Sequence, residues 1–190
     1  MKKPVVMTTK TLAYCALLTA LSVVLARLFG LMPEESSRYS IEAVPIFLSG
    51  MLFGPFAGGM VGFAADFIGC LFSPFGFNPI FCVPPILYGV FGGLFRHFLA
   101  KKLSPVRLFL SFALPVIFGS VLYQSFTLAY VYYYTTFWEG FLLKLSTRSV
   151  QFAIVWVVDV LLIWLLFQAN IFTRIGLWPP VRKKKKEDKV

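Results

Sequence analysis

The stretch 41-IEAVPIFLSGMLFGPFAGGMVGFAADFIGCLFSPFGFNP-79 decides how this chain folds. It is almost entirely apolar, yet prolines and glycines interrupt it, and Asp66 is its single charge after Glu42. In lipid every backbone polar group needs a partner inside the protein, so such breaks persist only where protein or a water-lined cavity surrounds them. Interrupted apolar segments of this kind indicate a ligand site within a membrane protein.

The composition of the whole chain indicates the same class. Of the 190 residues 58% are hydrophobic and only 14% are charged, and the mean hydropathy is +0.80, which describes an integral membrane protein. The net charge of +10 would suggest nucleic acid as a partner for a soluble protein. Here the basic residues flank the apolar segments and fill the tail, so membrane topology explains them better and we expect no nucleic-acid partner.

Six apolar segments follow one another along the chain, and we expect each to cross the membrane as a helix. The second would be only about 20 Å long, and Gly54-Pro55 ends it with a tight turn. The expected fold class is an all-α integral membrane protein with six transmembrane helices and a short, broken second segment. The membrane domain would span 1–170 and a basic cytoplasmic tail 171–190. The six segments are 11–31, 41–53, 56–72, 80–99, 108–134 and 147–168.

Charge distribution predicts the orientation of these segments. With six crossings both termini lie on one side, and that side would carry fourteen of the 18 Lys and Arg residues. Since basic residues accumulate on the cytoplasmic side, both termini should be cytoplasmic. The four basic residues left toward the outside are Arg27, Arg38, Lys144 and Arg148.

The sequence alone leaves two helix boundaries undecided. Pro84-Pro85 either kinks the fourth segment or marks where its helix begins, because proline removes a backbone donor. The pattern of residues 135–146 predicts an amphiphilic connector between the fifth and sixth segments.

Ionisable residues at membrane depth are costly and therefore indicate function. Arg27, Asp66 and Arg148 all fall toward the outer ends of their segments, where they would converge on one outer cavity. Snorkelling to the interface or an internal Asp–Arg pair would explain the same residues without a ligand. Asp159 lies deeper in the sixth segment, where we expect a structural ion pair or a subunit contact.

Aromatic and amide side chains near the outer loops suit a planar heteroaromatic ligand, because they combine flat apolar faces with a few hydrogen-bonding groups. The substrate-binding candidates of this type are Phe75, Phe77, Asn78, Tyr123, Gln124 and Trp138.

No enzyme constellation is recognisable. The single histidine, His97, has no acid beside it, and no Gly-rich loop ending in Lys-Ser/Thr is present. The three cysteines lack metal-ligand spacing and read as small buried hydrophobic residues. We therefore expect no catalytic residue, no metal and no cofactor.

The sequence FGPFAGGMVGFAADFIG at 53–69, followed by SPFGFNP at 73–79, resembles the substrate-binding S-components of energy-coupling-factor (ECF) vitamin transporters, and most closely their folate-specific branch. The resemblance extends from Lys10 to about Gln168. It implies a multi-pass protein of the bacterial cell membrane that binds a vitamin and docks on a transmembrane coupling (T) subunit, which works with two cytoplasmic ATPases. Docking would tip the subunit over in the lipid and release the vitamin inside.

The same resemblance implies roles for individual residues. Ala16 and Ala20 on the first helix would form the face that docks on the coupling subunit, and loops 32–40, 73–79 and 135–146 would close over the ligand. Asp66, Asn78 or Gln124 would form hydrogen bonds with the pterin edge of folate. Its carboxylates would be bound by Arg27, Arg38, Lys144 or Arg148, with bidentate geometry if by an arginine.

Two other interpretations stay open. The chain could be an S-component for another vitamin, a precursor or a nucleobase, in which case an uncharged ligand should tolerate loss of the outer arginines. It could instead be an integral membrane enzyme or assembly factor, which should show polar catalytic residues clustered at one interface.

Overall fold

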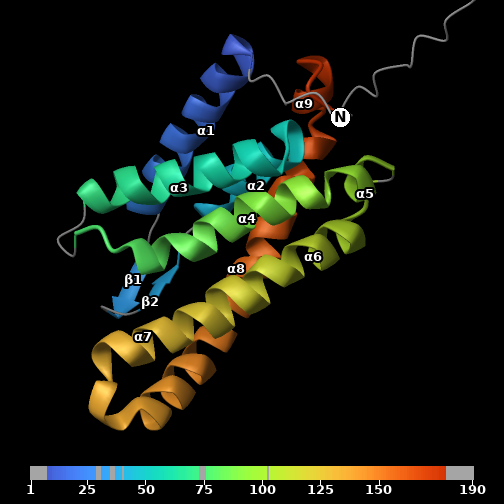
Figure 1. The fold of residues 1–190 in the computed structure, drawn as a ribbon. Coiled ribbons are helices and arrows are strands. Elements are labelled where there is room, and N and C mark those ends of the chain that lie inside the picture. Colours follow the sequence, from blue (N-terminus) through green and yellow to red (C-terminus); the bar gives the residue numbers. More distant parts are fainter. Residues whose placement is uncertain are drawn as a thin grey trace, which may run out of the picture.

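Helices make up nearly all of the described chain, with one small hairpin between the first two (Figure 1). The computed structural model describes residues 8–28, 31–34, 37–39, 41–72, 76–101 and 103–178. The elements in order are α1 Thr9–Leu28, β1 Leu31–Glu34, β2 Ser37–Tyr39, α2 Ala43–Phe53, α3 Pro55–Leu71, the 3₁₀ helix η1 Pro79–Cys82, α4 Val83–Leu94, α5 Arg96–Lys101, α6 Pro105–Leu114, the π-helical η2 Pro115–Tyr123, α7 Gln124–Tyr132, the 3₁₀ helix η3 Tyr134–Thr136, α8 Phe137–Gln168 and α9 Ile171–Arg174.

The helices have the length and composition of membrane spans. Among the described residues three stretches, Thr9–Arg27, Pro105–Tyr132 and Phe137–Gln168, are long and apolar enough to cross a bilayer. The apolar helices between the first two stretches are shorter, and α2 has only 11 residues, which confirms the short second segment. The chain is a multi-pass membrane protein.

Glycines bring the backbones of α2, α3 and α4 into direct contact. A Cβ atom on Gly50 would lie 2.0 Å from the carbonyl oxygen of Gly89, and one on Gly89 would lie 2.0 Å from the carbonyl oxygen of Gly58. Only glycine permits so close an approach of three helices. Gly50, Gly58 and Gly62 of the 41–79 stretch therefore form the surface on which α4 packs.

Prolines mark the helix starts in this layer. Gly54 adopts φ 108°, a conformation that favours glycine, and Pro55 follows as the first residue of α3. Pro84 and Pro85 lie in the first turn of α4, directly after η1, where a missing N–H breaks no helical bond. Of the two interpretations of this pair, the start of a helix is the one observed.

The prediction that residues 135–146 form a connector is wrong for most of that range. Only Tyr133 and η3 separate α7 from α8, which begins at Phe137 and runs for 32 residues, or about 48 Å. Gly140 does not interrupt the helix, because it packs against the ring of Tyr133 and a Cβ there would lie 2.4 Å from that side chain. Figure 1 shows α7 and the start of α8 extending away from the other helices at one end.

The buried core lies between α2, α4, α6 and α8. Phe47 and Phe112 are completely buried, and their ring centroids are 4.6 Å apart. Tyr88 packs on the same Phe112 ring at 5.3 Å, and Ile163 contributes from α8. After α8 the chain folds back, so that Trp178 packs on Phe167 with ring centroids 5.3 Å apart. This core holds the long α8 against the glycine-packed layer.

Candidate functional site

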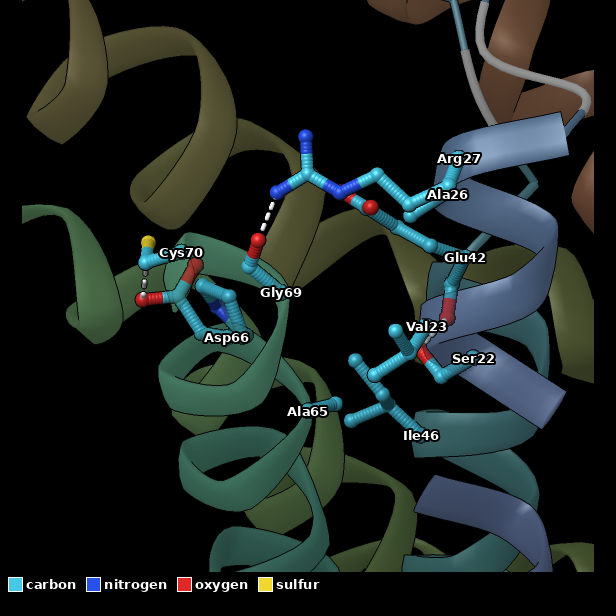
Figure 2. A pocket seen from close by; sticks show the side chains of 11 residues that line it. Ser22, Val23, Ala26, Arg27, Glu42, Ile46, Ala65, Asp66, Gly69 and Cys70 are labelled. Atoms are coloured by element: carbon cyan, nitrogen blue, oxygen red, sulfur yellow. Dashed lines mark hydrogen bonds between the residues drawn. The ribbon is translucent and has the colours of Figure 1, made fainter. Parts of the chain in front are cut away.

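A cavity of about 100 Å³ lies where α1, α2 and α3 meet (Figure 2). Polar residues of α1 and α3 and Glu42, which precedes α2, line it, and the hydroxyl of Ser22 donates to the carbonyl oxygen of Glu42 at 2.9 Å. Its lining residues are Ser22, Val23, Ala26, Arg27, Glu42, Ile46, Ala65, Asp66, Gly69, Cys70 and Pro85. The structure thus brings Arg27 and Asp66 to one site, as the sequence predicts.

Arg27 joins α1 to the end of α3. Its guanidinium donates a hydrogen bond to the carbonyl oxygen of Gly69, as Figure 2 shows. Gly69 lies in the last turn of α3, where carbonyls are open to outside partners and a cation is favoured. The Nε of Arg27 is buried and has no hydrogen-bond partner in the described part of the chain. Arg27 therefore caps a helix and also places a positive charge beside the cavity.

Asp66 is flanked by two thiols. Its Oδ2 accepts a hydrogen bond from Cys82 at 2.8 Å, and the Sγ of Cys70 lies 4.0 Å from the same oxygen. Cys70 faces the same way as Asp66 because it follows one helical turn later on α3. The sequence interpretation of these cysteines as inert hydrophobic residues missed this arrangement. The four-residue spacing of Asp66 and Cys70 on one helix could have indicated the contact between these two residues.

Two predicted ligand contacts instead hold η1 in place. The side-chain oxygen of Asn78 accepts from the N–H of Ile80 at 3.2 Å, and the hydroxyl of Tyr123 donates to the carbonyl oxygen of Ile80 at 3.1 Å. Phe77 packs its ring edge-on against Phe67, with centroids 5.0 Å apart. None of these three residues lines the cavity.

Arg148 lies in a second polar group, formed by α4, η2 and α8. It is only 7% exposed, and its NH1 approaches the carbonyl oxygen of Ser120 at 3.5 Å. The hydroxyls of Ser120 and Tyr88 are hydrogen-bonded at 2.9 Å. The guanidinium also lies over the Phe152 ring, 5.5 Å from its centroid. Within the described residues Arg148 forms no ion pair, and its buried Nε has no hydrogen-bond partner.

Asp159 differs from its sequence-based expectation. It is 0% exposed, and neither carboxyl oxygen has a hydrogen-bond partner in the described part of the chain. Complete burial rules out a contact with another subunit in this conformation, and no ion pair forms with Arg148. The reason is geometric: eleven residues along α8 separate the two by about 16 Å.

The other predicted contacts are dispersed. Trp138 is 72% exposed and packs against Phe137 and Phe141 on the protruding end of α8, with ring centroids 5.5 and 6.3 Å away. Gln124 is half-buried at the start of α7. Phe75 lies outside the described residues. Neither Trp138 nor Gln124 lines the cavity.

Ala16 and Ala20 are exposed on α1 and line an apolar groove of about 490 Å³ between α1 and α3. Met60, Ala64 and Ile68 of α3 form its other wall. Such a groove, lined by small residues on one side, permits close approach of a further helix.

Comparison with known proteins gives matches of three kinds. The model of the family "ECF-type riboflavin transporter, S component" matches residues 6–168. The folate transporter FolT of Clostridium novyi (strain NT) is 31% identical over 99 residues, which is 52% of this chain and 56% of that protein. The match thus spans little more than half of the relative's length. A crystal structure of FolT bound with folic acid superposes with a TM-score of 0.71 and 26% identity, covering 85% of this chain and 95% of that chain.

Proposed function

Because the chain belongs to the family of ECF-type riboflavin transporter S components, we propose that it is the folate-binding subunit of an ECF importer. Family membership makes the chain a substrate-binding transport component and not an enzyme. The family description names riboflavin, whereas the two individual relatives are named for folate. The choice between these vitamins therefore depends on the chemistry of the site.

The observation that carries the folate proposal is the buried guanidinium of Arg148, which has no ion-pair partner among the described residues. A buried charge without a counter-ion costs several kcal/mol. Folate brings two carboxylates that can accept charge-assisted hydrogen bonds from arginine, whereas riboflavin is uncharged. An anionic ligand thus compensates a cost that the empty protein carries, and this favours folate.

The cavity beside Asp66 would hold the other end of the ligand. The pterin edge presents N–H donors, which a carboxylate accepts, and Arg27 offers a donor on the opposite side. The cavity of about 100 Å³ is smaller than the roughly 300–1,000 Å³ of sites that enclose a drug-sized ligand. We infer that it takes only the pterin end of the ligand.

The proposed topology has six spans, formed by α1, α2, α3, α4 with η1, the continuous α6–η2–α7 helix, and α8. The start of α1 and α9 lie toward the same end of the molecule in Figure 1, with the β1–β2 hairpin and α7 toward the other. Together with the positive-inside distribution this supports cytoplasmic termini in a bacterial cell membrane. Residues 1–170 would form the membrane domain and 171–190 a basic tail that attracts anionic lipid.

Equilibrium binding tests the substrate. We expect folic acid to quench the tryptophan fluorescence of the purified protein saturably in detergent, and riboflavin to cause no saturable change at the same concentrations. Thiamine, biotin and a purine serve as further ligands. Saturable binding of riboflavin without folic acid would overturn the folate assignment while leaving the chain in its family.

The groove of Ala16 and Ala20 is proposed as the docking surface for the transmembrane coupling subunit. Ala16→Trp should fill the groove and abolish folate uptake by cells that carry the coupling subunit and both ATPases, with folic acid binding in detergent unchanged. Leu17→Trp is the matched control, because Leu17 is exposed on the same helix and does not line the groove. Equal uptake by the two variants, or loss of binding in Ala16→Trp, would contradict a docking role.

A further inference from the structure

A chain of hydrogen bonds leads from the end of η2 through η1 to the proposed pterin site. Tyr123 donates to the carbonyl oxygen of Ile80 within η1, and the thiol of Cys82 at the end of η1 donates to Oδ2 of Asp66. We propose that Cys82 is a positioning residue that orients the carboxylate of Asp66 for recognition of the pterin ring. This inference rests on the proposed folate function.

Cys82 acts through Asp66 rather than on the ligand. It is 3% exposed and does not line the cavity, whereas Asp66 is half-buried and does. A sulfur atom 2.8 Å from a carboxylate oxygen is in close hydrogen-bonding contact. A carboxylate can accept about four hydrogen bonds, and the thiol occupies one acceptor site on Oδ2.

The thiol can orient Asp66 because η1 is itself held from two sides. Asn78 caps its start by accepting from the N–H of Ile80, Pro79 restricts its first residue, and Tyr123 ties it to the η2–α7 helix. Cys82 is followed at once by α4, whose first turn contains Pro84 and Pro85. The donor is thus fixed by a rigid frame, so it immobilises the carboxylate before the ligand arrives and reduces the entropy lost on binding.

Cys70 does not duplicate this role. Its sulfur is 4.0 Å from the same Oδ2, which is the outer limit for a sulfur hydrogen bond, and it is half-exposed at the cavity. Cys70 also lies on the same helix as Asp66, one turn away, so its contact adds no tie between elements. Cys82 joins α3 to η1 and α4, and only its loss would release the carboxylate from this neighbouring element.

A double-mutant cycle on the full-length protein in detergent tests the proposal. Cys82→Ala should weaken folic acid binding about tenfold, and Cys82→Ser, which keeps a donor, should recover most of that loss. In an Asp66→Ala background, Cys82→Ala should have no further effect, because the residue acts through Asp66. Ser111→Ala is the control, since it removes a buried side-chain hydrogen bond on α6, away from the cavity.

A ligand fragment gives the second readout. N-(4-aminobenzoyl)-L-glutamate has no pterin ring, so its affinity should be the same for the wild type and Cys82→Ala. Equal tenfold losses for folic acid and the fragment, or additive effects of the two mutations, would make Cys82 a general structural residue and overturn the proposal. Unchanged folic acid affinity in Cys82→Ala would overturn it too. Failure of the wild type to bind folic acid would reject the proposed function itself, and this inference with it.

Discussion

Arg148→Ala is expected to weaken folic acid binding by about 10- to 100-fold, the value of a hydrogen bond between charged groups. Arg148 is 7% exposed and has no ion-pair partner among the described residues, so a ligand carboxylate would supply a counter-ion. Fluorescence titration of the purified protein measures the loss. Arg148→Lys should fall between wild type and alanine, because lysine keeps the charge without the bidentate geometry.

A ligand without carboxylates separates this explanation from a general disturbance of the site. The affinity for 6-hydroxymethylpterin should be the same in Arg148→Ala and in the wild type. If folic acid also bound both proteins equally, its carboxylates would be bound elsewhere and the argument from Arg148 would be wrong.

Replacing Arg148 by an apolar residue should not destabilise the ligand-free protein. Replacing an unpaired buried charge by an apolar side chain of similar length removes its desolvation penalty. The ligand-free Arg148→Met protein should therefore unfold at a temperature at least equal to that of the wild type, although it binds folic acid less well. A clearly lower unfolding temperature would show that the bond to the Ser120 carbonyl contributes more to the fold than the charge costs.

Gly58→Ala is expected to prevent stable folding. A Cβ atom at Gly58 would lie 2.2 Å from the carbonyl oxygen of Gly89 and 2.6 Å from the Cα of Gly50. Both neighbours are backbone atoms in the centre of the three-helix layer, so the helices themselves must separate. The loss should exceed the roughly 1–3 kcal/mol that is typical of overpacked cores. Size-exclusion chromatography and thermal unfolding in detergent measure the outcome as lost monodisperse protein.

The adjacent glycine is a matched control. A Cβ at Gly59 would approach only the side chains of Val90, at 3.2 Å, and Ile86, at 3.8 Å, and both can adjust. Gly59→Ala should therefore fold with nearly unchanged stability. Similar behaviour of the two variants would contradict the direct packing of backbones at Gly58.

Local patterns along the chain predicted much of the architecture. The short second segment, the turn at Gly54-Pro55 and the broad succession of apolar helices follow from the chain-local effects of glycine, proline and apolar runs. The residues at which helices begin and end were less predictable. The start of α8 at Phe137 was missed, because its amphiphilic first turns and Gly140 resemble a connector until Tyr133 packs against that glycine.

For the candidate site, too, the sequence predicted some features and missed others. Membrane depth was enough to select Arg27, Asp66 and Arg148, since a charge in an apolar segment is costly wherever the chain folds. It could not show that Arg27 caps the end of α3 or that Asn78 and Tyr123 hold η1. Nor could it show the thiol of Cys82 at Asp66, because 16 residues separate the two along the chain.

The sequence by itself determined that this is a membrane protein, which segments are apolar, where its breaks lie and to which family it is similar. These properties depend on composition and on interactions between neighbouring residues. Only the tertiary structure decided that Arg27 and Asp66 share a cavity that Arg148 does not line, and that the buried Asp159 has no hydrogen-bond partner among the described residues. Such pairings depend on which helix faces meet, and in this chain the contacts between the glycines of α2, α3 and α4 decide that.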